Sequence, residues 1–423
     1  MRILVLGSGA REHAIILALR AEETSHDVLA APGNAGIARD AMIVDLDPSR
    51  PADVTEFANE HDVDLVVIGP EAPLVAGVAD ALRGRGIPVF GPGRAAAQLE
   101  GSKAFAKRIM DAAGVPTGRA IRATTVAETA AAMDEFGSPY VVKADGLAAG
   151  KGVLVTDDRA AALAHAASFL PSGAVLVEEF LSGPEVSLFF LSDGDHVLPL
   201  SPAQDFKRLG DGDSGPNTGG MGAYSPLPWL AEPYGGERAF VDLVTREIAE
   251  PVIRQLDAEG TPFIGLLYAG LILTAGGVRV IEFNARFGDP ETQVVLPRLL
   301  DPLSQLLLAA ASGTLEDQPR PAFADAVAVT VVLASEGYPS SPVTGRTLTG
   351  LGAAAAVEGV HLAHAATAAQ GDALLATGGR VLNVVGLGTT FAEARERTYL
   401  ALSQIGLEGG QYRTDIAARV VED

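Results

Sequence analysis

The chain has 423 residues, enough for roughly two to four domains with sizeable hydrophobic cores. Its formal net charge of -22, from 31 basic and 53 acidic residues, repels polyanions and argues against non-specific nucleic-acid binding. The absence of cysteine excludes disulfides, thiolate metal sites and a cysteine nucleophile. Neither a secretory signal nor an apolar run of membrane-spanning length is present, so we expect a cytoplasmic protein without a membrane partner.

The first hundred residues alternate apolar strands with helices. The predicted strands span residues 2–6, 28–30, 64–68 and 88–90. A glycine-bearing turn and a helix over 11–21 follow the first strand, and this alternation is typical of a parallel, doubly wound α/β sheet. The sequence Gly91-Pro92-Gly93 favours a domain boundary close to residue 100.

Beyond that boundary the pattern predicts a larger region and a final module. A small insert at about 120–190 alternates short strands with two helices, over 126–136 and 159–169, and has a sheet of its own. The segment 210–222 is rich in glycine and polar residues, and a loop of that length is usually functional. The final module begins with a strand over 326–333 and includes a strand over 380–387 and a helix over 390–405.

A glycine-bearing turn at residues 7–11 connects the first strand to the first helix. Backbone N–H groups in this position can bind a phosphate, and Arg11 adds a positive charge. Glu12 occupies the place of the third glycine in a dinucleotide fingerprint, which argues against NAD and leaves either a single phosphate or a plain turn. Polar loops at 32–36 and 69–73 also follow strands, so all three are expected to converge on one ligand crevice.

Lysine is scarce: only five of the 31 basic residues are Lys, and all lie between 103 and 207. A compact, flexible ammonium acts where a planar guanidinium cannot, so this clustering indicates sites for point charges. Lys143 ends a predicted strand before a glycine loop, and Gly152 stands where a Walker loop requires Ser or Thr. A flap that closes over a triphosphate, with Lys143 on phosphate, fits better than the alternative of a surface hairpin.

Two segments carry candidate acidic groups. Residues 178–185 contain three glutamates around an apolar pair, although a solvated strand end has the same appearance. Glu282, Asn284 and Arg286 alternate along a predicted strand and therefore share one face. A carboxylate, an amide oxygen and a guanidinium on one face suit Mg²⁺ and phosphate together, whereas ordinary sheet polar groups are the alternative.

Several strings carry a resemblance to a known family. They are Gly-x-Gly-x-Arg-Glu-His-Ala at 7–14, Ala-Pro-Gly-Asn-Ala-Gly at 31–36, Gly-Pro-Glu-Ala-Pro-Leu at 69–74, Gly-Pro-Asn-Thr-Gly-Gly-Met-Gly-Ala-Tyr at 215–224 and Glu-Phe-Asn-x-Arg-Phe-Gly-Asp-Pro-Glu at 282–291. The order of three features along the chain is similar to that of the ATP-grasp ligases: Lys143 with its flap comes first, then residues 178–185, then residues 282–284. Together the strings resemble the phosphoribosylamine-glycine ligase (glycinamide ribonucleotide synthetase) family of de novo purine synthesis, over the whole chain.

The resemblance implies an α/β fold with three domains. These are an N-terminal parallel-sheet pre-ATP-grasp domain over 1–102, an ATP-grasp core over 103–325 with a mobile insert at about 120–190, and an α+β C-terminal domain over 326–423. Two departures from the family pattern stand out. Residues 265–274 lack the extra metal-binding acid of many ATP-grasp enzymes, and 415–419 is blander than the family's tail, which leaves the role of that tail open.

Site residues are also implied by the resemblance. ATP would be bound by Lys103, Lys143, Gly150, Glu178, Glu179, Phe180, Leu181 and Glu185. Mg²⁺ or Mn²⁺ would be bound by Glu282 and Asn284. The catalytic cations would be Lys143, Lys207 and Arg286. The remaining substrates would be contacted by Gly9, Arg11, Asn34, Glu71, Asp205, Asn217 and Asp289.

The implied activity is that of a carbon-nitrogen ligase. Glycine and 5-phosphoribosylamine would be joined through a glycyl phosphate, with ATP as co-substrate, giving glycinamide ribonucleotide, ADP and phosphate. The partners would be these small molecules, without nucleic acid, and the resemblance allows a transient contact with the amidotransferase that makes phosphoribosylamine. Two alternatives stay open: another ATP-grasp carboxylate-amine ligase or carboxylase with a different acceptor, and a nucleotide-binding sensor without turnover.

Overall fold

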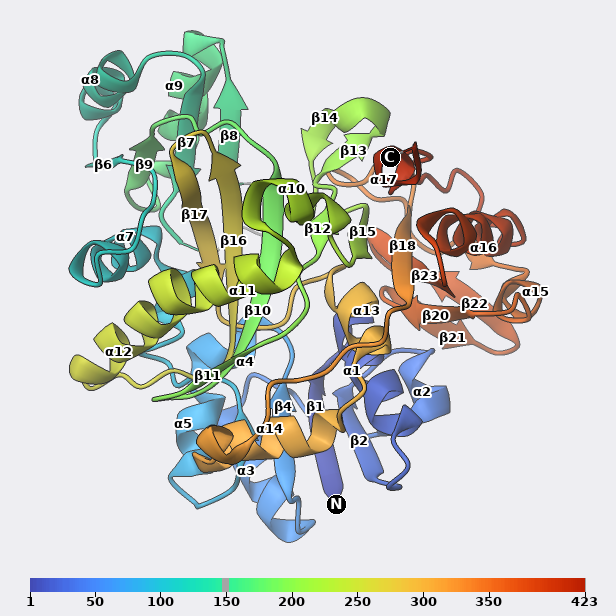
Figure 1. Ribbon diagram of the computed structural model, residues 1–423. Coiled ribbons are helices and arrows are strands. Elements are labelled where there is room, and N and C mark those ends of the chain that lie inside the picture. The colour runs from blue at the N-terminus through green and yellow to red at the C-terminus, as the bar shows by residue number, and fades with distance from the viewer. Residues whose placement is uncertain (147–151, 423) are drawn as a thin grey trace.

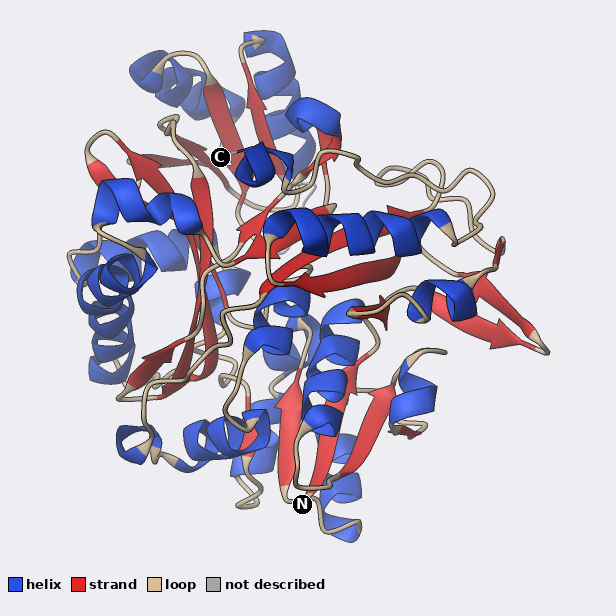
Figure 2. Ribbon diagram, turned by 45° about the vertical axis from the view of Figure 1, so that its right-hand side comes forward, coloured by secondary structure: helices blue, strands red, loops and turns tan. Residues whose placement is uncertain are grey.

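The structure, a computed structural model, describes residues 1–146 and 152–422, and its N-terminal part is a parallel sheet (Figure 1). The strand order is β3-β2-β1-β4-β5. The strands are β1 (Arg2–Gly7), β2 (Asp27–Pro32), β3 (Met42–Ile43), β4 (Leu65–Ile68) and β5 (Val89–Phe90). The helices are α1 (Ala10–Ala21), α2 (Ile37–Asp40), α3 (Pro51–Glu60), α4 (Glu71–Ala76) and α5 (Val78–Arg83). Apart from Arg2, the residues of β1 and β4 are buried, as expected for parallel strands covered on both faces, and Figure 2 shows helices beside these strands.

A four-stranded antiparallel sheet forms the insert. Its order is β6-β9-β7-β8. The elements are β6 (Ala120–Ala123), α8 (Val126–Phe136), β7 (Tyr140–Ala144), β8 (Val153–Thr156), α9 (Arg159–Phe169) and β9 (Val175–Glu178), after α6 (Gln98–Gly101) and α7 (Lys103–Ala112). Thr125 and Asp158 cap the two insert helices by accepting backbone N–H bonds, which explains why both begin where the sequence predicts. A small separate core that includes Met133 and Val142 holds the helices on the sheet.

The central sheet is antiparallel, in the order β11-β10-β16-β17. Its strands are β10 (Glu185–Asp193), β11 (Val197–Pro199), β16 (Ile264–Thr274) and β17 (Gly277–Asn284). The helices near it are α10 (Ala231–Tyr234), α11 (Glu237–Val244), α12 (Glu250–Ala258), α13 (Thr292–Val295) and α14 (Leu303–Ser312). A π-helical stretch over Thr245–Ala249 joins α11 to α12, just before Pro251, whose missing N–H removes an α-helical hydrogen bond.

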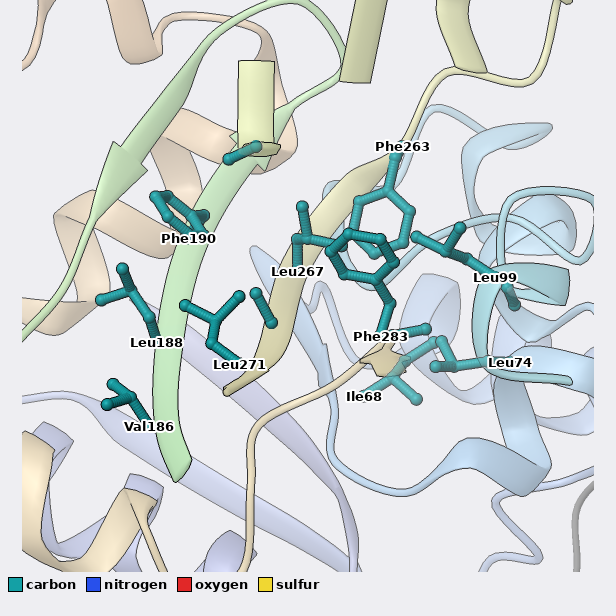
Figure 3. Packing of buried hydrophobic residues seen from close by; sticks show 14 of the residues in the cluster. Ile68, Leu74, Leu99, Val186, Leu188, Phe190, Phe263, Leu267, Leu271 and Phe283 are labelled. Atoms are coloured by element: carbon teal, nitrogen blue, oxygen red, sulfur yellow. The ribbon is translucent and has the colours of Figure 1, made fainter. Parts of the chain in front are cut away.

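One apolar core joins the N-terminal sheet to the central sheet. Figure 3 shows Ile68 and Leu74 from the N-terminal part packed near Phe283 and Leu267 of the central strands. These side chains are almost completely buried. Burial of apolar area contributes about 25 cal/mol per Å², so this contact fixes the carboxyl ends of the parallel strands against β16 and β17.

The last sheet combines strands from distant parts of the chain. Its order is β12-β15-β18-β23-β20. The strands are β12 (Gln204–Asp205), β15 (Gly222–Ser225), β18 (Val327–Ala334), β20 (Val360–His364) and β23 (Arg380–Gly388). The surrounding elements are α15 (Leu351–Ala355), α16 (Phe391–Ser403), α17 (Ala418–Glu422) and a small sheet of β19 (Thr347–Leu348), β22 (Ala373–Ala376) and β21 (Thr367–Gln370). The sheet therefore crosses the boundary expected near residue 326.

The glycine-rich segment 210–222 is more regular than the sequence indicates. β13 (Arg208–Gly210) and β14 (Ser214–Asn217) pair as an antiparallel hairpin around a short turn. Gly212 in that turn has φ +64°, a left-handed conformation that glycine adopts without strain. The expectation of an irregular loop is corrected for 210–217, because the backbone groups there pair with one another.

Across the part of the chain that the structure describes, no helix has the length and apolar character needed to cross a membrane.

Candidate functional site

A cavity of about 1440 Å³ lies among the N-terminal loops, the insert, the central sheet and the C-terminal sheet. Ser8, Lys143, Glu282 and Arg380 are examples of its lining from each of these parts. Sites for one small ligand usually measure about 300–1,000 Å³, so this cavity has room for more than one molecule. Its volume therefore fits a reaction between several substrates.

Three lysines, two of them paired with one carboxylate, gather at the insert end of the cavity. The Nζ atoms of Lys143 and Lys107 lie 2.9 and 3.5 Å from Oε2 of Glu178. Lys103 donates to the carbonyl of Gly146 at 3.1 Å. Burial lowers the pKa of Lys103, and repulsion from Lys143 adds to this, whereas attraction by Glu282 opposes it. Three ammonium groups gathered in one part of the cavity suit a polyphosphate.

An apolar pair lies in the cavity wall beyond the insert sheet. Phe180 and Leu181 line the cavity beyond β9, and the Phe180 side chain is exposed. Glu179 accepts from the backbone N–H of Arg119 at 2.9 Å, and Glu178 is paired with Lys143, so both carboxylates have partners within the protein. The apolar pair and the backbone are therefore the groups left for contact with a flat ring.

A second ion-pair group lies across the cavity. Lys207 donates to Oε2 of Glu185 at 2.6 Å. Burial acts against the charge of Lys207, but Asp205 and Glu185 outweigh it and raise its pKa well above the ordinary value. Burial raises the pKa of Asp205 to about 7, against the attraction of Lys207 and with repulsion from Glu291. Lys207 is thus a permanent cation, and Glu185 is bound to it.

Glu282 and Asn284 lie at the end of β17 and line the same cavity. Burial opposes ionisation of Glu282, but the charges of Lys207 and Lys143 outweigh it and lower the carboxyl's pKa. An ionised carboxylate and an amide oxygen are ligands that suit a divalent cation. On the neighbouring strand Gly270 stands opposite Glu282, and within residues 1–146 and 152–422 no group of three His, Asp or Glu side chains forms a metal cage. These residues fit an ion whose other ligands are phosphate and water.

The buried side chain of Glu12 contacts the N-terminal loops and holds them in place. It is almost fully buried, and its carboxylate accepts from the Gly9 N–H at 2.6 Å and from Nε of Arg11 at 2.6 Å. A Cβ atom at Gly7 or Gly69 would overlap the Glu12 side chain, so both loops need glycine at those points. Arg11 also donates through Nη1 to the Phe287 carbonyl at 3.1 Å, so an anion at this end has the neighbouring backbone N–H groups and the remaining N–H groups of Arg11 as its donors.

Acidic and basic side chains form ion pairs where the N-terminal loops meet the segment after β17. Arg286 pairs with Glu100 at 2.9 Å and lies 3.8 Å from Glu71. Burial acts against the Arg286 guanidinium, but Glu100 and Glu71 outweigh it and raise its pKa. Asp289 is 3.0 Å from Nη2 of Arg380, at the start of β23. The C-terminal part therefore contributes a cation to the cavity wall.

Models of one protein family match three consecutive regions of the chain. They are described as the N domain (residues 1–100), the ATP-grasp (A) domain (101–292) and the C domain (328–419) of phosphoribosylglycinamide synthetase. The phosphoribosylamine-glycine ligase of Leifsonia xyli subsp. xyli is 71% identical over 422 residues, which cover 99% of this chain and 100% of the relative. The chain belongs to the phosphoribosylglycinamide synthetase family. The resemblance seen in the sequence is thereby confirmed.

Solved structures place this phosphoribosylglycinamide synthetase family member among the ATP-grasp folds. The phosphoribosylamine-glycine ligase of Thermotoga maritima is 34% identical, with a TM-score of 0.80, covering 98% of this chain and 100% of that one. The biotin carboxylase domain of the Hydrogenobacter thermophilus 2-oxoglutarate carboxylase is 16% identical, with a TM-score of 0.69 and coverage of 100% and 94%. The second likeness shows the fold alone. The α/β ATP-grasp fold predicted from the sequence is confirmed.

Most of the expected site residues of this family member line the cavity. Two do not follow that pattern, since Gly150 lies outside the described residues and Asn34 is absent from the described cavity lining. The Asn34 amide donates to the carbonyls of Ser8 and His364 at 2.9 and 2.8 Å, and its oxygen accepts the N–H of Gly36. Asn34 therefore shapes its loop, and its expected substrate contact stays a prediction.

Sequence reasoning missed several residues of the cavity wall. Lys107 donates to Thr117 and Gly118 as well as pairing with Glu178, and the clustering of the five lysines was a signal that could have found it. Tyr338 and Arg380 also line the cavity, from the C-terminal part of this phosphoribosylglycinamide synthetase family member. Neither belongs to a string that indicates chemistry, so only the fold reveals them.

Proposed function

We propose that this protein joins glycine to 5-phosphoribosylamine with ATP and Mg²⁺, giving glycinamide ribonucleotide, ADP and phosphate for de novo purine synthesis. Family membership supports a carbon-nitrogen ligase with ATP as co-substrate. The observation that carries the proposal is the continuity of one cavity from the Gly7–Arg11 loop, past Glu282, to the lysine cluster at Lys143. A phosphorylated amine at one end and a triphosphate at the other can therefore meet in the middle.

The reaction needs activation of a carboxylate, which is a poor electrophile. An oxygen of glycine attacks the γ-phosphorus of ATP, the bond to the β-phosphate oxygen breaks, and glycyl phosphate and ADP form. The amine nitrogen then attacks the glycyl carbon and displaces phosphate, with loss of a proton. The atoms balance without a covalent enzyme intermediate. The protein's contribution is therefore positioning and charge neutralisation.

The charged side chains have separate roles in this proposal. Lys143 and Lys207 flank the transferring phosphoryl group, and Lys103 contacts the ATP phosphates. Arg286, held by Glu100 and Glu71, presents a fixed positive charge at the junction with the substrate end. A divalent ion held by Glu282 and Asn284, Mg²⁺ or Mn²⁺, would neutralise phosphate charge when bound.

The substrate end has its own assignments. Arg11 and the 7–11 loop bind the 5-phosphate, and Glu71, Asp205, Asn217 and Asp289 are the candidates for the glycine and amine groups, all of them in the cavity lining. Phe180 and Leu181 contact adenine, while Glu185 binds the ribose hydroxyls. We further propose action in the cytoplasm and a transient contact with the amidotransferase that supplies phosphoribosylamine.

Selectivity for the carboxylate tests the proposed function. Purified protein with ATP, Mg²⁺ and phosphoribosylamine generated in place is expected to release ADP with glycine and to form a ribonucleotide amide. Alanine adds one methyl group, which a close-fitting site rejects by roughly 10- to 200-fold. Equal turnover with larger amino acids would contradict the assignment, and turnover with bicarbonate instead of glycine would favour a carboxylase.

Arg11 tests the division of the cavity into two ends. Arg11→Ala removes a charge-assisted contact worth about 1.5–3 kcal/mol, so the apparent affinity for phosphoribosylamine is expected to fall by roughly 10- to 150-fold. The KM values of ATP and glycine should change little. Steady-state titration of each substrate measures this, with Arg20→Ala, an exposed position in the last turn of α1, as the control. A raised KM for ATP with an unchanged value for the amine would assign the loop to the nucleotide.

A further inference from the structure

Arg413, in the segment after α16, is almost fully buried although it carries a permanent charge. Its Nε and Nη2 atoms donate to the two oxygens of Asp415, both at 2.7 Å. Nη1 donates to Asp213 at 2.9 Å and to the carbonyl of Arg208 at 3.2 Å. A buried guanidinium with four donor bonds is held in one orientation, so whatever it contacts is held as well.

The contacts of Arg413 converge on the segment that carries Lys207. The guanidinium carbon lies 4.9 Å from the centre of the Phe206 ring, in a cation–π contact with the residue that precedes Lys207. The carbonyl of Arg208, the residue that follows Lys207, accepts from the same side chain. Arg413 thus holds both chain neighbours of Lys207.

The other side of this segment is fixed by the glycine-rich stretch. The backbone N–H and hydroxyl of Thr218 donate to the carbonyl of Lys207 at 2.8 and 2.9 Å. Thr414 and Asp415 hold the turn of the β13–β14 hairpin, since Asp211 accepts from the Thr414 N–H at 2.8 Å and Asp415 accepts from the Gly212 N–H at 2.8 Å. Burial disfavours the Asp415 charge, but hydrogen bonds from Arg413 and Gly212 outweigh it and lower its pKa to about 2.

We propose that Arg413 is a positioning residue of the active site, which fixes Lys207 through Phe206 and the Arg208 carbonyl. The inference deepens the proposed function, because Lys207 is one of the two cations placed at the transferring phosphoryl group. Arg413 is itself part of the cavity lining, but its bonds to Asp415, Asp213 and the Arg208 carbonyl engage its donors, so in this proposal it acts through Lys207 and not on a substrate. It also gives the C-terminal segment, whose sequence alone indicates no chemistry, a place in phosphoryl transfer.

A double-mutant cycle with Lys207 tests this inference. Arg413→Ala is expected to lower kcat by roughly 10- to 100-fold, since a displacement of about 1 Å at a reacting group costs about that much, with little change in the KM of phosphoribosylamine. In the Lys207→Met background the same substitution is expected to have almost no further effect, because the group that it positions is gone. Independent effects that multiply in the double variant would overturn the proposal.

Two control variants distinguish a loss of catalysis from a loss of protein stability. Arg346→Ala is the matched control, because Arg346 donates to the Glu408 carbonyl in the same C-terminal region but is not among the residues described as lining the cavity. It should leave kcat unchanged. If Arg413→Ala does not fold, Arg413→Lys enters the cycle, since an ammonium keeps the charge but cannot form the paired bonds or stack flat. A lowered melting temperature with unchanged kcat would show a merely structural role.

The outcomes separate this inference from the proposed function. The wild-type protein is first assayed for glycine-dependent ADP release. If another carboxylate supports turnover instead, the proposed function fails, and the cycle is then run with that carboxylate, since Lys207 would serve phosphoryl transfer to either. Coupling between Arg413 and Lys207 in that assay still supports the positioning role.

Discussion

Replacement of Glu282 by alanine is expected to lower kcat by roughly two orders of magnitude or more while the protein remains folded. Glu282 is the carboxylate that, with Asn284, fits the divalent ion, and it lies among the ammonium groups of Lys207 and Lys143. Without it, the ion loses its charged protein ligand and the lysines repel one another. The fold should survive, because Glu282 belongs to the cavity wall and the apolar core lies on the Phe283 side of β17.

The measurement is ADP release over a range of Mg²⁺ concentrations, together with the melting temperature. Glu282→Gln keeps an oxygen donor but loses the charge, so it is expected to recover part of the activity at high Mg²⁺. Glu259→Ala, which removes a carboxylate paired with Arg108 on the surface, is the matched control and should behave like the wild type. An unfolded Glu282→Ala protein would indicate a structural role, and a folded, fully active one would remove Glu282 from the site.

Lys143→Met is expected to lower kcat/KM for ATP by roughly 100- to 1,000-fold. The side chain is nearly buried, and its ammonium lies 2.9 Å from Oε2 of Glu178 and helps to lower the pKa of Glu282. Methionine has a similar length and packs along the same path but supplies no charge to the phosphates. Glu178 keeps Lys107 as a partner at 3.5 Å, so the insert should stay folded.

Two comparisons make the Lys143 result specific. Lys143→Arg restores a positive charge in a flat, delocalised form and is expected to recover only part of the rate. Isothermal titration of the non-reacting product ADP should show a smaller loss of affinity than the loss in kcat/KM, because the charge acts most strongly on the transferring phosphoryl group. A loss that is equal for both would mean that Lys143 contributes ordinary binding.

Local features of the fold follow closely from the sequence. Helices α8 and α9 begin and end at the predicted residues, because Thr125 and Asp158 cap them and Gly137 ends the first. Alternation of strands and helices also predicts the parallel N-terminal sheet. Pairing between distant segments is different: β15 joins β18 across about a hundred residues, and no local periodicity encodes that contact.

The site residues also fall into two groups, those that local sequence strings indicate and those that only the fold brings together. Lys143 and Glu282 belong to strings with a chemical reason for their spacing, so the sequence indicates them. Arg380 and Arg413 are single arginines in ordinary surroundings, and their importance comes from what the fold brings to them. Asn34 is a motif residue whose side chain holds its own loop, a structural role that the string alone does not show.

The sheet shared between early and late strands also constrains how the protein is made. All five strands of the N-terminal sheet lie within the first 90 residues, so that sheet can form soon after this part leaves the ribosome. β15 has no such option, because its partner β18 is complete only once residue 334 has been synthesised. Throughout that interval β15 is an open edge strand with buried-type side chains such as Ala223 and Tyr224. The nascent chain therefore carries an aggregation-prone edge for about a quarter of its translation.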